Sequence, residues 1–188
     1  MPKSSEFSRR RFLGDFAGAI SCASHFLAGR SLADTFSSGV SQQEDNSTVF
    51  YNEKKRLVYH KTASPCKPYV KELYTAGGVQ VLRDSPHDHK HHHGLMFAVR
   101  VDGVDFWSET PGCGREEPQG IVSSRGGGVN GNAHHILDQC VAWRNATGEV
   151  LLDETRAIGI AIRQENPITL VTWRSQLRPP KGKAAVKL

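Results

Sequence analysis

The sequence predicts an all-β protein, an antiparallel β-sandwich preceded by a signal helix. Three observations support this prediction. From Arg56 onward, short runs of β-branched and aromatic residues alternate with turn residues, as they do in antiparallel sheets. Asp102-Gly103 separates two such runs, which is a strong signal for a two-residue hairpin. After Ala33, no segment repeats its apolar residues every 3.6 positions, so no amphipathic helix is expected.

The individual strands follow from turn residues along the chain. Residues 145–148, Asn-Ala-Thr-Gly, indicate a second hairpin, and Asn166-Pro167 precedes a last strand. The three glycines at 126–128 indicate a loop. The expected strands cover residues 79–82, 95–101, 104–107, 136–143, 149–162 and 168–177.

The N-terminus is typical of an export signal. Residues 8–13, Ser-Arg-Arg-Arg-Phe-Leu, match the twin-arginine motif, and a mildly apolar stretch and a small-residue cleavage site at 31–33 follow. We therefore predict a twin-arginine signal peptide at 1–33, the twin-arginine export machinery as a partner, and a periplasmic or extracellular protein. Residues 34–55 are rich in Ser, Gln, Asp and Asn, which predicts a flexible linker and leaves 56–188 for the sandwich domain.

The net charge argues against nucleic acid as a partner. The 188-residue chain has a formal net charge of +5, but the predicted signal contains five basic and two acidic residues. The remaining chain would carry about +2, too little for the basic surface of a nucleic-acid-binding protein. Beyond the first thirty residues no run of ~18–20 apolar residues occurs, so we expect no transmembrane anchor.

Three cysteines follow the predicted signal, at Cys66, Cys113 and Cys140. In an oxidising compartment, this odd number allows at most one internal disulfide and leaves one spare thiol. Their spacing contains no CxxC motif, so a cysteine-based zinc or redox site is not expected. The sequence leaves the disulfide pairing open.

The most unusual stretch is residues 84–94, which hold five of the nine histidines within seven positions. On an extended backbone, residues two apart point to the same face. One face would carry His87, His89, His91 and His93, and the other Asp88 and His92. Imidazoles gathered in this way make either a metal site or an acid–base site.

Transition-metal binding is the first hypothesis for this run. Two histidines on one strand face need a third ligand from a neighbouring strand. Asp88 would orient one imidazole by accepting a hydrogen bond from the ring nitrogen that does not bind the metal. Imidazole and carboxylate donors suit Cu or Zn in particular. The expected ligands are His87, His89, His91, His92, Glu109 and His134, with His135 as the alternative to His134.

Metal-free acid–base chemistry on a small molecule or carbohydrate is the second hypothesis. His87 or His91 would be the acid and Glu109 the base. Trp107 would offer a stacking face for a sugar ring, and Arg83 or Arg100 a contact to a hydroxyl group. A third interpretation is a solvated, structural histidine-rich loop between Pro86 and Gly94.

Residues 67–109 also resemble a known family. Lys67-Pro-Tyr-Val, the Asp84–Gly94 run, Leu-Met-Phe-Ala and Asp105-Phe-Trp-Ser-Glu look like the bacterial family labelled "methane oxygenase PmoA". The resemblance implies a soluble, exported β-protein with a histidine-rich motif. His93 stands where that family often has Arg, so His93 is the least transferable histidine. Members of that family typically continue well past the position of residue 188 with more strands. The resemblance therefore predicts that the sandwich is incomplete at residue 188 and belongs to a larger super-sandwich.

Overall fold

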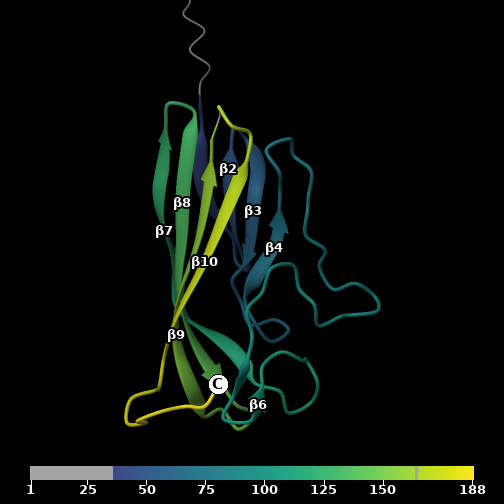
Figure 1. Ribbon diagram of the computed structural model, residues 1–188, viewed down its shortest axis with the longest axis vertical. Helices are drawn as coiled ribbons and strands as arrows, with labels where there is room; N and C mark the ends of the chain where they lie inside the picture. Colours follow the sequence, from purple (N-terminus) through teal and green to yellow (C-terminus); the bar gives the residue numbers. More distant parts are fainter. Residues whose placement is uncertain (1–35, 164) are drawn as a thin grey trace, which may run out of the picture. The chain divides into compact units, whose positions relative to one another are not determined.

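The computed structural model describes residues 36–163 and 165–188, and all regular structure in this part of the chain is β-strand. Ten strands form two four-stranded antiparallel sheets and one small hairpin (Figure 1). The predicted all-β class and antiparallel sheets are confirmed. The predicted signal helix at 1–33 lies outside the described residues. Over the ranges just given, no helix has the length and hydrophobicity needed to cross a membrane.

The first sheet comes from residues 38–73 and has the order β1-β2-β3-β4. Each strand pairs antiparallel with the next one along the chain. Asn52 and Glu53 both have positive φ in the turn between β2 and β3, which matches the twist of a tight hairpin. The strands are β1 (Ser38–Gln42), β2 (Asn46–Tyr51), β3 (Lys54–His60) and β4 (Tyr69–Leu73).

The linker predicted over residues 34–55 is wrong, because β1 and β2 lie within it. Val49 and Tyr51 are two residues apart in β2, so both side chains face the interior and are buried. The polar composition of residues 34–55 is the reason that these strands were not predicted. A strand with one buried face needs apolar residues only at every second position.

The second sheet has the order β10-β9-β8-β7, and all its pairings are antiparallel. The pairing of β8 with β9 confirms the hairpin predicted at 145–148, and the pairing of β9 with β10 confirms the predicted last strand. The strands are β7 (Arg115–Val129), β8 (Asn132–Arg144), β9 (Val150–Ile162) and β10 (Thr169–Arg178).

The glycines at 126–128 belong to β7 and do not form the predicted loop. Gly126 pairs with His135 of β8. A Cβ atom at Gly126 would collide with the carbonyl oxygen of His134, and one at Gly128 would collide with the ring of Phe36. Glycine therefore permits the close approach of β8 at Gly126 and of Phe36 at Gly128.

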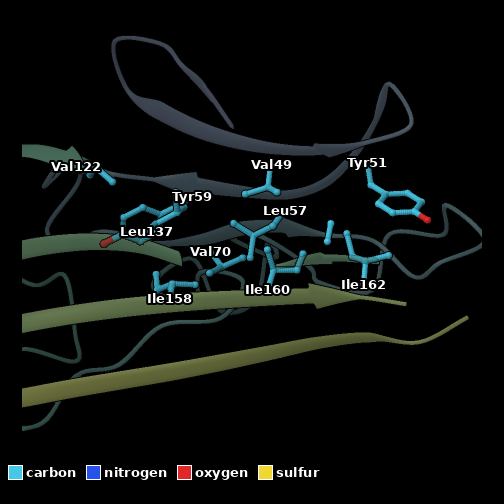
Figure 2. Packing of buried hydrophobic residues seen from close by; sticks show 11 residues of the cluster. Val49, Tyr51, Leu57, Tyr59, Val70, Val122, Leu137, Ile158, Ile160 and Ile162 are labelled. Carbon is cyan, nitrogen blue, oxygen red and sulfur yellow. The ribbon is translucent and has the colours of Figure 1, made fainter. Parts of the chain in front are cut away.

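The two sheets pack face to face around an apolar core (Figure 2). Val49 and Leu57 of the first sheet join Ile158 and Ile160 of β9 in this core, and each is at most 1% exposed. Burying a side chain of this size contributes about 1.5–3 kcal/mol. The core therefore fixes one half of the long second sheet against the first sheet.

A second apolar cluster covers the other half of the long strands. Trp143 of β8 is fully buried there, with its ring 4.8 Å from that of Phe106. Asp102 and Gly103 both have positive φ and form the predicted turn, so this hairpin is confirmed. Its two short strands are β5 (Arg100–Val101) and β6 (Val104–Asp105).

Two other runs predicted as strands, 79–82 and most of 95–101, are irregular in the structure. Single bridges from Tyr74 to Gln80 and from Val70 to Leu95 tie them to the rest of the chain. Val79 and Val81 are both more than half exposed, so their apolar alternation does not reflect a buried strand face. The chain between these bridges leaves the sheet as a loop beside β4, and this loop carries the histidines.

Candidate functional site

The histidine-rich run forms a compact turn. The backbone N–H of Ser85 donates to the carbonyl oxygen of His92 at 2.9 Å and closes the turn at its base. Within it, His89 N–H donates to the Pro86 carbonyl at 2.9 Å, because proline favours a turn over a paired strand. The prediction of a shared strand face is therefore wrong for His87, His89, His91 and His93.

His87 and Asp88 lie at the exposed tip of this turn. The His87 side chain is 90% exposed, so no fixed geometry pairs it with Glu109 as predicted. Asp88 lies 3.1 Å from Nδ1 of His89, and its own backbone N–H together with His89 lowers the pKa of Asp88. Asp88 thus contacts an imidazole, as predicted, but it does so in solvent.

Three imidazoles crowd together in the same turn, those of His89, His91 and His92. Their ring centroids lie 4.4 Å (His91–His92), 4.9 Å (His89–His92) and 6.4 Å (His89–His91) apart. Desolvation and the neighbouring imidazoles lower the pKa of His92, which favours its neutral form. Within residues 36–163 and 165–188, no three His, Cys, Asp or Glu side chains already converge as a metal site, so these rings would have to rotate to bind one ion.

His93 is buried, with 4% of its side chain exposed. Its Nδ1 lies 2.8 Å from Oδ1 of Asp84, and its Nε2 lies 2.8 Å from Oε1 of Glu109. The ring stacks on Tyr69 at a centroid distance of 4.5 Å, and the Tyr69 hydroxyl donates to Oδ2 of Asp84 at 3.2 Å. Burial and the adjacent Asp84 raise the pKa of Tyr69, which keeps this hydroxyl a donor. His93, the least transferable histidine in the family resemblance, is therefore the one that lies between two carboxyl groups.

The hydrogen bonds around His93 locate one of its protons. The Ser85 hydroxyl donates its single proton to the Lys90 carbonyl oxygen at 2.7 Å, so it can only accept from Nδ1, 3.1 Å away. Nδ1 therefore carries a proton and donates it toward Asp84 and Ser85. Nε2 is left to share a proton with Glu109, as in sites where a carboxylate orients a histidine for proton transfer.

Glu109 lies at the outer end of this set of contacts, with 17% of its side chain exposed. Its Oε1 is also 3.4 Å from Nζ of Lys67, whose side chain is fully buried. Lys67 donates a second hydrogen bond to the carbonyl oxygen of Trp107 at 3.1 Å. A buried ammonium group needs such acceptors, so Lys67 anchors this loop. Among the described residues both contacts to Glu109 use Oε1, and none uses Oε2.

The backbone holds the histidine side of the site against β4. The Val70–Leu95 bridge ties the end of the turn to that strand directly after Tyr69. Gly94 precedes this bridge with a φ of 21°, and a Cβ atom there would collide with the Val70 carbonyl oxygen. The close approach of Gly94 to β4 therefore places the adjacent His93 over Tyr69.

The loop on the Glu109 side is ordered by Asp105. Its carboxylate accepts a hydrogen bond from the Trp107 N–H at 2.8 Å and from the Ser108 hydroxyl at 2.6 Å. These bonds lower the pKa of Asp105 and hold the turn that leads to Glu109. Trp107 is 44% exposed, and its ring lies edge-on to that of His92 at a centroid distance of 5.5 Å, so part of the residue is open to solvent beside the site.

Arg83 and Arg100 were expected to contact a hydroxyl group of a ligand, and this expectation stays a prediction. Arg83 and Arg100 are exposed. Among the described residues, neither forms a hydrogen bond or an ion pair with Asp84, His93 or Glu109.

His134 and His135 do not join the site. Both lie near the start of β8, whereas Trp143, near its end, packs against Phe106, three residues before Glu109. Nine residues of strand separate His134 from Trp143 by roughly 30 Å. The prediction that His134, or His135 in its place, supplies a ligand beside the histidine run is therefore wrong. His135 is buried, burial lowers its pKa, and its Nε2 has no partner within the described residues.

A second buried network lies next to the site. Arg156 donates to Glu154 at 2.7 Å and to Glu116 at 2.6 Å, and all three residues are buried. Arg156 also donates to the carbonyl oxygen of Pro68 at 3.0 Å, directly after Lys67. Burial raises the pKa of Glu116 to about 7. This network braces the segment that carries Lys67 against β7 and β9.

Three residues that contact His93 or Glu109 were not predicted from the sequence, namely Lys67, Tyr69 and Asp84. All three lie within residues 67–109, the stretch that resembles a known family. That resemblance is the one feature of the sequence that pointed to this region. Face periodicity could not identify them, because their contacts join residues 9 to 42 positions apart through irregular loops.

Comparisons with known proteins place the chain in a family. A family model described as "Family of unknown function (DUF6807)" matches residues 46–188. This range includes every residue of the site, from Lys67 to Glu109. Searches of curated proteins and of solved structures found no match. Because the match covers about three quarters of the sequence, the chain belongs to the DUF6807 family.

Proposed function

We propose that this protein is exported and that it binds a small polar molecule, with a carbohydrate as the leading candidate. We further propose that it transfers a proton to or from this ligand. The contact that carries the proposal is the 2.8 Å approach of His93 Nε2 to Glu109 Oε1, with Nδ1 already committed to Asp84. Such a pair can hold a proton at either partner. A histidine and a carboxylate beside an open aromatic face suit a sugar hydroxyl or anomeric centre.

In this proposal, Glu109 is the catalytic residue that faces the ligand. Its Oε2 accepts a proton from the ligand or donates one to it, while Oε1 exchanges a proton with Nε2 of His93. Asp84 keeps the ring in the required tautomer, and Lys67 fixes the position of the carboxylate. His93 replaces His87 and His91 as the histidine of the acid–base pair, because it is the one in contact with Glu109.

Trp107 supports a ring-shaped ligand. Trp107 is 44% exposed, two residues before Glu109, and lies beside the imidazole of His92, whose lowered pKa favours the neutral form. Aromatic faces bind the apolar faces of sugar rings, while hydroxyl groups need polar partners of the kind that Glu109 and His92 offer.

The test is a tryptophan-fluorescence titration of the metal-free full-length chain with a panel of neutral, amino and acidic sugars at millimolar concentration. We expect at least one saturable change that Trp107→Ala abolishes and that Glu109→Gln or His93→Gln weakens about tenfold or more. His87→Gln is the matched control and should bind as the wild type does. The proposal fails if no sugar changes the fluorescence, or if Trp107→Ala binds with unchanged affinity.

A transition-metal site at His89, His91 and His92 is the second candidate, favoured by the spacing of their three rings. Rotation of these rings, of which that of His89 is exposed and those of His91 and His92 are partly exposed, would present three nitrogens to Cu or Zn. Elemental analysis of untagged protein should then find one equivalent of metal that survives dialysis. The triple variant H89Q/H91Q/H92Q should lose it and His87→Gln should keep it. Sub-stoichiometric metal that dialysis removes would rule this site out.

A further inference from the structure

Two cysteines meet directly behind the proposed site. The sulfur atoms of Cys66 and Cys113 lie 3.7 Å apart, although the residues are 47 positions apart in the sequence. Cys66 immediately precedes Lys67, and Cys113 lies in the loop that follows Glu109. Cys66 is buried and Cys113 is partly exposed.

The backbone holds both cysteines in this position. The Cys66 carbonyl oxygen accepts a hydrogen bond from the N–H of Glu116 on β7 at 2.9 Å. The N–H of Cys113 donates to the Thr110 carbonyl oxygen at 3.1 Å, and the next residue, Gly114, donates to the Asp105 carbonyl oxygen at 2.8 Å. The proximity of the two sulfur atoms therefore results from hydrogen-bonded segments on both sides.

We propose that Cys66 and Cys113 form a disulfide, and that this bond fastens the segment of Lys67 to the loop of Glu109. Cys140 is not the partner, because it is exposed in the middle of β8, where it pairs with Gln119 and Thr155 on the neighbouring strands. The proposal stands on the thiol geometry and holds whether or not the site binds a sugar.

The oxidation needs a disulfide oxidant, such as a thiol–disulfide oxidoreductase or glutathione disulfide. The Cys113 thiolate attacks the oxidant and forms a mixed disulfide, which releases one thiol of the oxidant. The Cys66 thiolate then attacks the sulfur of Cys113 and releases the second thiol. The two cysteines lose two electrons and two protons, and the oxidant is reduced to two thiols.

The surroundings set the order of these two steps. Burial and the adjacent Cys113 thiol raise the pKa of Cys66 to about 11, so Cys66 is a poor first nucleophile. Cys113 is the more accessible thiol and reacts first. The sulfur atoms must then approach by about 1.7 Å to reach the bond length of a disulfide, a movement that side-chain rotation can supply.

The test uses the full-length chain, which contains four cysteines, in buffers of defined ratios of reduced to oxidised glutathione. Alkylation followed by mass spectrometry should show two thiols protected together, and a non-reducing peptide map should link Cys66 to Cys113. Cys140→Ser is the matched control and should keep this protection, whereas Cys66→Ser and Cys113→Ser should each lose it. A map that links Cys140 to another cysteine, or four thiols that stay reactive under strongly oxidising conditions, would overturn the proposal.

Amide hydrogen exchange then tests the effect on the site. In the oxidised protein, the loop of residues 105–114 should exchange at least several-fold more slowly than in the reduced protein. The double variant C66S/C113S should show no difference between the two conditions. Equal exchange in both redox states of the wild type would contradict the proposed fastening, even if the disulfide itself forms.

Discussion

At the scale of the residue, burial separates histidines that are neighbours in the sequence. His93 is 4% exposed and contacts two carboxylates, whereas His87, six positions earlier, is 90% exposed. The two side chains are chemically identical. The packing of His93 on Tyr69 and the contacts with its two carboxyl partners give it a defined orientation that His87 lacks. Fixed geometry is what an acid–base group requires.

Glu116 makes the stability of this protein depend on pH. Burial raises its folded-state pKa to about 7 from an ordinary value of 4.5. Between these values, the folded carboxyl keeps a proton that the unfolded chain has released. The contribution of Glu116 to the free energy of unfolding is therefore fully present below pH 4.5 and is lost as the pH rises through about 7.

We expect this loss to be on the order of 1–3 kcal/mol between pH 4.5 and pH 7.5. Urea unfolding at a series of pH values measures it. Glu116→Gln should remove this decrease of the free energy of unfolding with pH. Glu44→Gln, at an exposed position, should keep it. If the free energy of unfolding depends on pH in the same way in the wild type and in Glu116→Gln, a group other than Glu116 is responsible.

At the scale of the element, the structure corrects several strand assignments. Composition suggested a linker where β1 and β2 form, and a loop at the three glycines of β7. Paired strands tolerate polar or glycine residues when a neighbouring strand supplies hydrogen bonds and a core covers one face. Conversely, the apolar run at 79–82 remains irregular: one isolated bridge, from Tyr74 to Gln80, and a few backbone hydrogen bonds join it to the preceding turn and β4 without forming a ladder.

Gly94 controls the junction between the histidine turn and β4. Gly94→Ala should destabilise the protein by about 2–4 kcal/mol, because a Cβ atom there would meet the Val70 carbonyl oxygen at positive φ. The matched control is Gly77→Ala, whose nearest neighbour, Oγ1 of Thr75, is 3.8 Å from the added atom. Chemical denaturation measures both variants. Equal stability of the two would contradict a tight junction at Gly94.

At the scale of the whole molecule, the two four-stranded sheets share one core. Leu57 from the first sheet and Ile160 from the second belong to the same buried cluster (Figure 2). Neither sheet can bury its apolar face without the other, so residues of both sheets should unfold in one transition.

Leu57→Ala and Ile160→Ala should each lower the free energy of unfolding by about 2–5 kcal/mol. In each variant, the fluorescence of the buried Trp143 and the amide exchange of β2 and β3 should report the same loss. Leu170→Ala, at a position 56% exposed, is the control and should change stability by less than about 0.5 kcal/mol. Different losses at the two probes would show that the sheets unfold separately.

The sequence by itself determined the all-β class, the hairpins at 102–103 and 145–148, and the part of the chain that holds the site. These features depend on local turn chemistry and apolar alternation, which short stretches encode directly. Glu109 and Trp107, both named from the sequence, contact His93 and His92 in the structure.

The tertiary structure alone decided which histidine is buried and which residues surround it. Lys67, Tyr69 and Asp84 reach His93 and Glu109 from separate loops, and a sequence without pairing information does not show how such loops fold against one another. The side chains of His87 and His93 differ only in their surroundings, because solvation and partners come from packing between segments that are distant in the sequence.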